Sequence, residues 1–255
     1  MNLDALFSLQ GLTAVVTGGS SGIGRGIARA LAGAGASTVI LARGADRVGA
    51  VVAEIEAAGG HAAGVVADLS TREGIAEAGD AAIVPFGDPD ILVNSAGINL
   101  RPPLDQIDMD VWDATMTVNL EAPFLLSQRF APRMLERGFG RLIHVSSQQA
   151  HRAFVTSGVY GVSKGGLESL ARSQAEAWSS QGITANTLVP GFVLTPLNAR
   201  LQQDPDKVQQ LAERTMVGRN GMPDDFAGIS VFLAGRSSGY ITGQSLFVDG
   251  GLSAH

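Results

Sequence analysis

A tyrosine and a lysine lie four residues apart, at Tyr160 and Lys164, in a chain of 255 residues that holds only two of each. Chance gives such a pair with a probability of roughly 0.02, so the spacing carries information. Positions i and i+4 of a helix lie on one face, so the phenol and the ammonium could point at one site. A cation there lowers a tyrosine pKa towards the range of an acid/base catalyst. The alternative is a partly buried tyrosine beside a solvated lysine.

A glycine-rich segment, Thr17–Gly24, directly follows an expected strand and precedes a helical pattern that begins near Arg25. Glycines there let the backbone turn tightly and bring its N–H groups close to a pyrophosphate, which the helix dipole also favours. The strand before and the helix after distinguish this segment from an ordinary glycine-rich turn. The predicted contacts with a dinucleotide are Gly18, Ser20, Ser21, Gly22, Ile23 and Gly24.

Arg43 follows Ala42 at the end of the second expected strand, where a dinucleotide fold usually places an acid on the adenosine ribose. A carboxylate there would repel a 2′-phosphate, whereas an arginine can pair with it. The sequence therefore predicts a preference for NADP(H) without excluding NAD(H). The alternative is a solvated arginine at a strand exit, because one arginine is weak evidence and Arg47 lies nearby.

Two further strand ends carry candidate nucleotide contacts. Asp68 and Leu69 follow the third expected strand, and a capping box predicted for Ser70 and Glu73 leaves the Asp68 carboxylate available for the adenine edge. The segment Asn94–Gly97 follows the fourth strand. It offers an amide and small residues where the backbone must pass close to a planar group. An Asx turn is the alternative for its asparagine. The predicted contacts from this segment are Asn94, Ala96 and Gly97.

The elements that must position these residues alternate along the chain. The expected strands are Leu12–Thr17, Thr38–Ala42, Ala62–Ala67, Asp90–Val93, Arg141–Ser146, Ile183–Val189 and Ser245–Val248. The expected helices are Ile23–Ala34, Arg47–Ala58, Thr71–Val84, Met109–Glu136, Tyr160–Ser180 and Pro223–Ala234. This alternation predicts an α/β fold: a doubly wound parallel sheet of about seven strands in one Rossmann-type domain over residues 1–255. The long insertion Pro190–Asp224 is expected to cover the substrate as a lid.

Composition excludes several classes of function. Charged residues make up only 16% of the chain, the net charge is −6, and no Lys/Arg run occurs, so a nucleic-acid partner has little support. With no cysteine and four histidines without ligand spacing, a metal site is not expected. The amino terminus lacks a leader pattern and no segment holds 18 uninterrupted apolar residues, so we expect a cytoplasmic protein without a membrane partner. A small molecule is the expected partner.

Together these motifs resemble the short-chain dehydrogenase/reductase family in its compact single-domain form, and the resemblance covers essentially the whole chain. The segments that match the family's T-G-x-x-x-G-x-G, N-N-A-G and Y-x-x-x-K motifs are Thr17–Gly24, Asn94–Gly97 and Tyr160–Lys164. Pro190–Gly191 and Val248–Gly251 also match. Ser95 stands where the family has a second asparagine, a mild departure at a position that we take as structural.

The resemblance implies a catalytic tetrad, which maps to Asn119, Ser147, Tyr160 and Lys164. In it, Tyr160 exchanges a proton with the substrate oxygen, and Ser147 donates a hydrogen bond to that oxygen as charge develops. Lys164 would hold the nicotinamide ribose and lower the pKa of Tyr160, and Asn119 would hold a water in the proton path. Ser146 is the rival of Ser147, although strand alternation lets only one of them face the site. A locally bonded helix amide is the alternative for Asn119.

The segment after the sixth strand resembles the part of the family that contacts the nicotinamide carboxamide. Val193 and Thr195 are the implied contacts, together with Pro190 and Gly191 before them. Thr195 followed by Pro196 is also a good helix N-cap with a proline in the first turn. Both uses can hold, since a capped helix needs only one side-chain acceptor.

The implied activity is an enzyme's hydride transfer between nicotinamide and a secondary alcohol or ketone. The polar run Gln148–Arg152 and a closeness to gluconate-5-dehydrogenase-like members favour a sugar, polyol or sugar acid. The runner-up is a 3-oxoacyl thioester reductase, and the rival of another class is a non-catalytic nucleotide-sensing module. The candidate pocket residues are Gln148, Gln149, His151, Arg152, Phe192, Leu197 and Arg101. Arg101 and Arg152 are predicted to grip a carboxylate, unless both face water.

The family's usual assembly implies a homotetramer. Its interface is built from the long fourth and fifth helices and the carboxyl-terminal strand. Here the alanine-rich Leu167–Ala177 offers a flat, weakly charged helix face, which is also compatible with packing inside a monomer.

Overall fold

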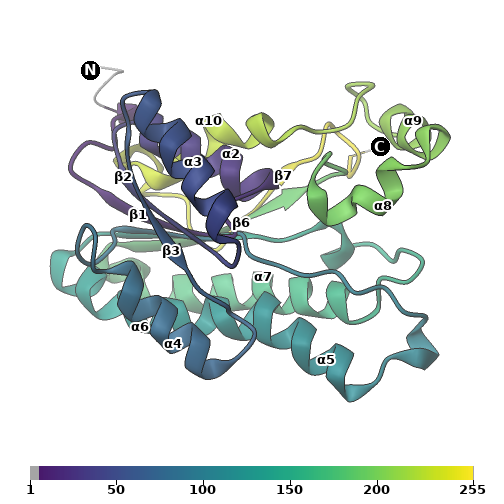
Figure 1. The fold of residues 1–255 in the computed structure, drawn as a ribbon, viewed down its shortest axis with the longest axis horizontal. Helices are drawn as coiled ribbons and strands as arrows, with labels where there is room; N and C mark the ends of the chain where they lie inside the picture. The colour runs from purple at the N-terminus through teal and green to yellow at the C-terminus, as the bar shows by residue number, and fades with distance from the viewer. Residues whose placement is uncertain (1–5, 255) are drawn as a thin grey trace.

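Seven strands form one parallel sheet in the order β3-β2-β1-β4-β5-β6-β7 (Figure 1). The computed structural model describes residues 6–254, so the first five residues of the amino terminus and His255 lie outside it. The strands are β1 (Thr13–Thr17), β2 (Ser37–Ala42), β3 (His61–Val66), β4 (Ile91–Asn94), β5 (Gly140–Val145), β6 (Ile183–Pro190) and β7 (Ser245–Val248). Each lies within one residue of its predicted bounds. The strand order reverses beside β1, where doubly wound sheets bind ligands.

Helices cover both faces of the sheet. The helices are α2 (Gly22–Gly33), α3 (Ala45–Ala57), α4 (Arg72–Ala82), α5 (Met109–Met116), α6 (Ala122–Arg137), α7 (Gly158–Trp178), α8 (Ala199–Gln202), α9 (Pro205–Glu213) and α10 (Ala227–Ala234). Figure 1 shows α2, α3 and α10 on one face and α4, α5, α6 and α7 on the other. Two apolar cores result, one on each face, because β1, β4, β5 and β6 are buried at every residue. The predicted fold class is confirmed.

One predicted helix is interrupted. The run Met109–Glu136 divides into α5, a π-helical turn at Thr117–Glu121, and α6. Such π turns are rare and occur often at functional sites. This one contains Asn119, which is fully buried. A π turn contains one more residue than an α-helical turn. The apolar periodicity of the sequence continues across Thr117–Glu121, so it did not indicate this insertion.

The predicted capping box of Ser70 and Glu73 is wrong. The N-cap of α4 is Thr71, whose side chain accepts from the Gly74 N–H at 3.0 Å. The Asp68 carboxylate instead accepts from the Ser70 N–H at 3.1 Å, which forms an Asx turn just before the helix. The helix begins one residue later than the capping box predicted, because Thr71 accepts from the Gly74 N–H, one residue beyond the N–H that Ser70 would have capped.

The insertion Pro190–Asp224 has its own short elements. A 3₁₀ turn at Pro196–Asn198 leads into α8 and α9, and Val193 pairs with Gly221 to close the segment on itself. Large apolar side chains stay exposed on it, namely Leu197, Met216, Val217 and Met222. Exposed apolar groups on a segment beside the strand ends suit a lid that covers a bound molecule. Within residues 6–254, no helix combines the length and apolarity needed to cross a bilayer.

Candidate functional site

The glycine loop after β1 packs too closely for side chains. A Cβ on Gly18, whose φ is +66°, would lie 2.8 Å from the Ala96 nitrogen, and one on Gly24 would lie 2.5 Å from the Gly18 carbonyl oxygen. The next helix, α2, starts without a side-chain cap from Ser21 and without an acid in its first turn. Its first N–H groups and its dipole therefore remain available for an anion, which fits the predicted pyrophosphate site.

Thr17 connects this loop to the turn after β4. Its Oγ1 accepts hydrogen bonds from the N–H groups of Ser95 and Ala96, both at 3.1 Å. This role was missed in the sequence analysis, although the threonine belongs to the recognised motif. A hydroxyl at the end of one parallel strand is well placed to hold the turn after its neighbour, because β1 and β4 are paired.

Asn94 lies inside the sheet rather than in the turn. Its Nδ2 lies 3.1 Å from Nδ1 of His144, and Nε2 of His144 lies 2.8 Å from Oε1 of Gln174. Burial lowers the pKa of His144 to about 4, so the imidazole is neutral at physiological pH. The Asn94 amide is therefore engaged with β5, and the turn beyond it is formed by Ser95, Ala96 and Gly97.

Tyr160 and Lys164 lie on one face of α7, as their spacing predicted. Both are buried, and the Lys164 Nζ lies 5.7 Å from the Tyr160 ring centre. The ammonium donates to the Val145 carbonyl at 2.8 Å, which ties α7 to the end of β5. Burial lowers the pKa of Lys164 to about 8. The alternative of a solvated lysine on a surface helix is excluded.

The pKa of Tyr160 departs from the sequence-based expectation. Burial raises it to about 12, while a hydrogen bond with Ser147 and the charge of Arg101 oppose the rise. Burial disfavours the phenolate more than these neighbours favour it. The Lys164 ammonium, held by the Val145 carbonyl, lies 5.7 Å from the centre of the Tyr160 ring. At neutral pH the phenol is protonated and can act as a proton donor.

Asn119 joins three segments at the base of this pair. Its Oδ1 accepts from the Ile98 N–H at 2.9 Å, and its Nδ2 donates to the Ile98 carbonyl and to Ser163 Oγ. A Cβ on Gly97 would lie 3.3 Å from Asn119 Oδ1 and 3.6 Å from the Lys164 Nζ. The asparagine is thus bonded to the turn after β4 and to α7, rather than locally within its own helix. Ser163 was missed in the sequence analysis, although it lies between Tyr160 and Lys164.

Ser146 and Ser147 point in different directions. Ser147 is half-buried, its Oγ accepts from the Gln149 N–H at 3.1 Å, and its side chain lies close enough to Tyr160 to oppose the rise of the Tyr160 pKa. Ser146 is buried and donates to Glu168 at 2.6 Å. The serine beside the tyrosine is therefore Ser147, in agreement with the alternation expected at a strand end.

The segment after Ser147 passes directly over α7. A Cβ on Gly161 would lie 2.8 Å from the Gln149 carbonyl oxygen, so a glycine is required there. Gln149 accepts from the Ser157 hydroxyl at 2.7 Å, and Gln148 donates to Asp249. These contacts fix the 3₁₀ turn Gln148–Ala150 between α7 and the carboxyl terminus.

His151 and Arg152 are engaged elsewhere. His151 Nε2 lies 3.0 Å from the Glu168 carboxylate, and its ring lies 4.9 Å from that of Phe247. Arg152 donates to the Ser253 carbonyl at 3.0 Å. This bond uses one nitrogen of Arg152, so its contact with a substrate carboxylate stays a prediction.

Arg101 is held by the loop that precedes α7. It donates to the Val155 carbonyl at 2.9 Å and to Thr156 Oγ1 at 3.3 Å, and its charge acts on the Tyr160 pKa. Among the described residues, Thr156 is the one non-glycine residue with positive φ, at 57°. Such a conformation is strained for a β-branched residue, and strain of this kind gathers at functional sites.

The second strand and the lid approach the glycine loop from two sides. Arg43 and Arg47 are both exposed and make no hydrogen bond or ion pair with any described residue, and the Arg47 guanidinium lies beside Gly44. A Cβ on Gly22 would meet the Thr195 side chain at 3.2 Å, and one on Gly191 would meet Asp249 at 2.9 Å. The predicted cofactor residues of β1, β2, β4 and β6 thus lie along one edge of the sheet.

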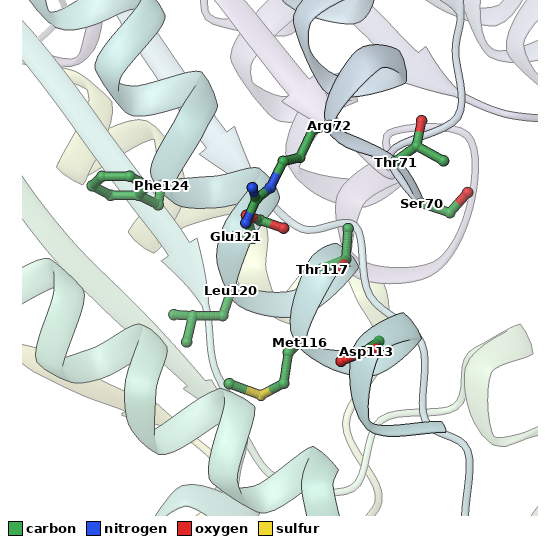
Figure 2. Close-up of a pocket in the computed structure, with 9 residues that line it drawn as sticks. All are labelled: Ser70, Thr71, Arg72, Asp113, Met116, Thr117, Leu120, Glu121 and Phe124. Carbon is green, nitrogen blue, oxygen red and sulfur yellow. The ribbon is translucent and has the colours of Figure 1, made fainter. Parts of the chain in front are cut away.

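A separate cavity lies on the outer face of α5 and α6. It has a volume of about 630 Å³, and its position beside the start of α4 is visible in Figure 2. The lining residues are Ser70, Thr71, Arg72, Asp113, Met116, Thr117, Leu120, Glu121 and Phe124. Arg72 pairs with Glu121 at 2.6 Å across it. None of the predicted site residues line this cavity.

Comparison with known proteins places the chain in a family. A family model described as enoyl-(acyl carrier protein) reductase, a model of short-chain dehydrogenase/reductases, matches residues 18–253. The gluconate 5-dehydrogenase of Gluconobacter oxydans (strain 621H) is 36% identical over 248 residues, which covers 97% of each chain. The solved gluconate 5-dehydrogenase from Burkholderia cenocepacia J2315, in complex with NADP and tartrate, has a TM-score of 0.93 and 37% identity, with 100% of each chain covered.

A solved 3-oxoacyl (acyl-carrier-protein) reductase from Agrobacterium tumefaciens C58, with NADP bound, is also similar. Its TM-score is 0.91 at 33% identity, and the match covers 98% of this chain and 97% of that one. The chain belongs to the short-chain dehydrogenase/reductase family, which confirms the resemblance read from the motifs. It is therefore an NAD(P)-dependent oxidoreductase that acts on CH–OH groups.

Proposed function

We propose that this protein is an NADP-preferring oxidoreductase that interconverts a secondary alcohol and a ketone on a sugar, polyol or sugar acid. The observation that carries the proposal is the convergence of Ser147, Tyr160, Lys164 and Asn119 at the carboxyl end of the sheet. A non-catalytic nucleotide-sensing module has no need of these four side chains at one place. The cofactor supplies and accepts the hydride, and the chain supplies orientation, proton transfer and electrostatic stabilisation.

Each member of the set has a separable role in this proposal. Tyr160 gives a proton to the carbonyl oxygen during reduction and takes one from the alcohol during oxidation. Ser147 donates a hydrogen bond to that oxygen as it gains charge. Lys164 holds the nicotinamide ribose, and Asn119 keeps a water in the path by which the proton returns to solvent. The bonds of Asn119 to Ile98 and Ser163 hold its amide beside Lys164.

The NADP preference rests on the end of β2. Ala42 leaves room for a 2′-phosphate, and the exposed Arg43 has no competing partner among the described residues. The other proposed cofactor contacts are Gly18, Ser20, Ser21, Gly22, Ile23, Gly24, Asp68, Leu69, Asn94, Ala96, Gly97, Pro190, Gly191, Val193 and Thr195.

The preference for a sugar acid rests on Arg101. Both arginines predicted to hold a carboxylate already bond to the chain, but Arg101 is the one that lies close enough to Tyr160 to influence its pKa. Two of its nitrogens are used by the loop, and Nη1 has no partner among the described residues. A carboxylate beside the reacting carbon would meet this nitrogen. Gln149 and Phe192 remain proposed parts of the pocket, and His151 a more distant one.

Arg101→Ala is expected to raise the KM for a sugar acid by about tenfold or more, with little change in kcat, because it removes binding that is equal in the ground and transition states. KM for a neutral polyol should change much less. Initial-rate kinetics on both substrates with NADP(H) measure the difference. Arg152→Ala is the matched control, and an unchanged KM in Arg101→Ala would remove the arginine from the substrate site.

The substrate class is tested by a panel of polyols, sugar acids and acetoacetyl thioesters with both cofactors. The proposal expects the highest kcat/KM on a polyhydroxylated substrate with NADP(H). The runner-up, a 3-oxoacyl thioester reductase, is favoured by the similarity to the Agrobacterium tumefaciens enzyme. Turnover of acetoacetyl thioesters alone would establish the runner-up instead.

We also propose a cytoplasmic homotetramer. On the helix face Leu167–Ala177, the side chains of Leu167, Ala171 and Ala175 are buried in the core of the chain, which agrees with the alternative of packing inside a monomer. The exposed apolar side chains lie instead on the outer side of α5, α6 and α7, at Met109, Trp112, Phe124 and Val162. Light scattering at micromolar concentration should give about four times the chain mass of 26.3 kDa, and Phe124→Glu should lower it. A wild-type mass of one chain would exclude the tetramer.

A further inference from the structure

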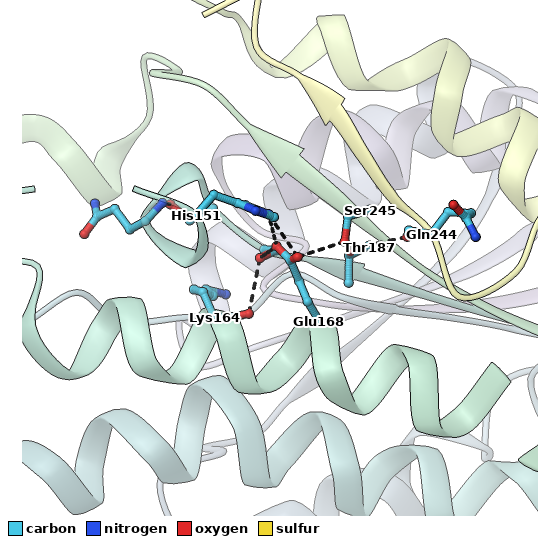
Figure 3. A network of polar contacts seen from close by, with 9 residues as sticks. His151, Lys164, Glu168, Thr187, Gln244 and Ser245 are labelled. Carbon is cyan, nitrogen blue, oxygen red and sulfur yellow. Dashed lines mark hydrogen bonds and ion pairs between the residues drawn. The ribbon is translucent and has the colours of Figure 1, made fainter. Parts of the chain in front are cut away.

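A buried carboxylate, Glu168, lies one helical turn beyond Lys164 on α7. It is 4% exposed and is not part of the proposed tetrad. Its Oε1 accepts from Ser146 Oγ at 2.6 Å, and its Oε2 accepts from Ser245 Oγ at 2.8 Å. His151 Nε2 lies 3.0 Å from the same carboxylate, so three side chains satisfy it (Figure 3). A buried carboxylate is costly unless it is satisfied in this way.

The three partners come from different parts of the chain. Ser146 is the residue immediately before Ser147, His151 is the residue after the 3₁₀ turn, and Ser245 begins β7, where Thr187 of β6 also bonds to it. Glu168 therefore holds both ends of the segment Ser146–His151 against α7. Figure 3 shows Glu168 between His151 on one side and Ser245 on the other, with Lys164 on the same helix.

The held segment contains Ser147, and the holding helix carries Tyr160 and Lys164. Ser146 Oγ also lies 3.4 Å from the Lys164 carbonyl, so the contact falls within the turn of α7 that carries the lysine. The His151 ring is fixed on its other side by Phe247. A displacement of the segment would move the serine relative to the tyrosine, because only four residues lie between Ser146 and His151.

We propose that Glu168 is a positioning residue for the reaction, which sets the place of Ser147 beside Tyr160 by holding Ser146 and His151 against α7. The inference rests on the proposed function for its kinetic consequence. Its geometric consequence, the position of Ser147 relative to the Tyr160 phenol, is independent of any substrate. Loss of the carboxylate displaces Ser147 from this position and leaves the nucleotide contacts at the glycine loop in place.

The chain contains only two tyrosines, which makes a direct measurement possible. In a Tyr240→Phe background, ¹³C-labelled tyrosine gives a single ring signal from Tyr160, and its shift reports the surroundings of the phenol. Glu168→Leu is expected to move this signal, whereas Glu168→Gln, which retains an acceptor oxygen, is expected to leave it near its original position. Glu176→Leu, on the exposed side of α7, is the matched control. His151→Phe keeps the ring contact with Phe247 and releases only the far end of the segment.

In kinetics, Glu168→Leu is expected to lower kcat by about 10- to 100-fold, the scale of a small misplacement of reacting groups. The Kd for NADPH should stay within about twofold of the wild-type value, because the substitution does not change contacts that bind equally in the ground and transition states. If Glu168→Gln restores kcat, the hydrogen bonds of this side chain, and not its negative charge, position the reacting groups. An unmoved Tyr160 signal in both Glu168→Leu and His151→Phe would overturn the inference, as would an equal effect of Glu176→Leu. If Glu168→Leu does not fold, the Tyr160 ring signals of His151→Phe and Glu168→Gln test the inference. If no ketone is reduced by the wild type, the proposed function fails and the tyrosine signal still decides this inference.

Discussion

Tyr160→Phe is expected to lower kcat by at least about 10²-fold, the usual scale of general acid–base catalysis. The substitution removes one oxygen from a buried ring and retains the ring itself. Ser147 and Lys164 keep their backbone partners, so NADPH binding should persist. Steady-state kinetics together with fluorescence titration of NADPH measure the two effects separately.

The same prediction has a pH dependence. Because burial raises the pKa of Tyr160 to about 12, the phenol is protonated over the neutral range and is ready to donate. Oxidation requires the phenolate, so its rate should rise with pH through the alkaline range, whereas the rate of reduction should not. Tyr240→Phe is the control, since Tyr240 is fully exposed. Near-normal turnover in Tyr160→Phe would remove the tyrosine from the chemistry.

Arg43→Ala is expected to weaken NADPH binding by about 1.5–3 kcal/mol, the value of a hydrogen bond to a charged group, and to leave NADH nearly unchanged. The physical reason is the 2′-phosphate, which only NADPH carries. Ala42→Asp should reverse the preference, because a carboxylate repels that phosphate and accepts from the 2′-hydroxyl. Binding titrations of both nucleotides at equal salt measure the difference, since screening weakens such a pair.

Arg47→Ala distinguishes the two neighbouring arginines. Arg47 lies against Gly44, so its removal should affect NADPH less than the removal of Arg43. A greater loss in Arg47→Ala would transfer the phosphate contact to that residue. Tighter binding of NADH than of NADPH by the wild type would contradict the preference itself.

The sheet could be predicted closely from local pattern. Each strand lies within one residue of its expected bounds, because short apolar runs between glycine-rich turns have few other ways to be buried on both faces. The common helix face of Tyr160 and Lys164 also followed from spacing alone. Both results depend on the period of the backbone and need no knowledge of distant contacts.

Helix details were less predictable. The π turn around Asn119 inserts a residue without changing the apolar pattern, and the shift of the α4 cap from Ser70 to Thr71 depends on which hydroxyl reaches a free N–H. The face of Leu167–Ala177 was compatible with a subunit interface or with packing inside a monomer, and Leu167, Ala171 and Ala175 pack in the core. Small residues are compatible with either a core or a surface, so composition could not decide.

The sequence by itself determined the fold class, the family and the positions of the residues that could do chemistry, because local periodicity and fixed motif spacing specify them. Only the tertiary structure decided the partners of those residues. In the structure, Ser146 donates to Glu168 and Ser147 lies beside Tyr160. Arg152 donates to the Ser253 carbonyl near the carboxyl terminus. The tertiary structure also raised the Tyr160 pKa, since burial depends on every segment that packs around the ring. Contacts between segments far apart in the chain follow from packing, which no local pattern specifies.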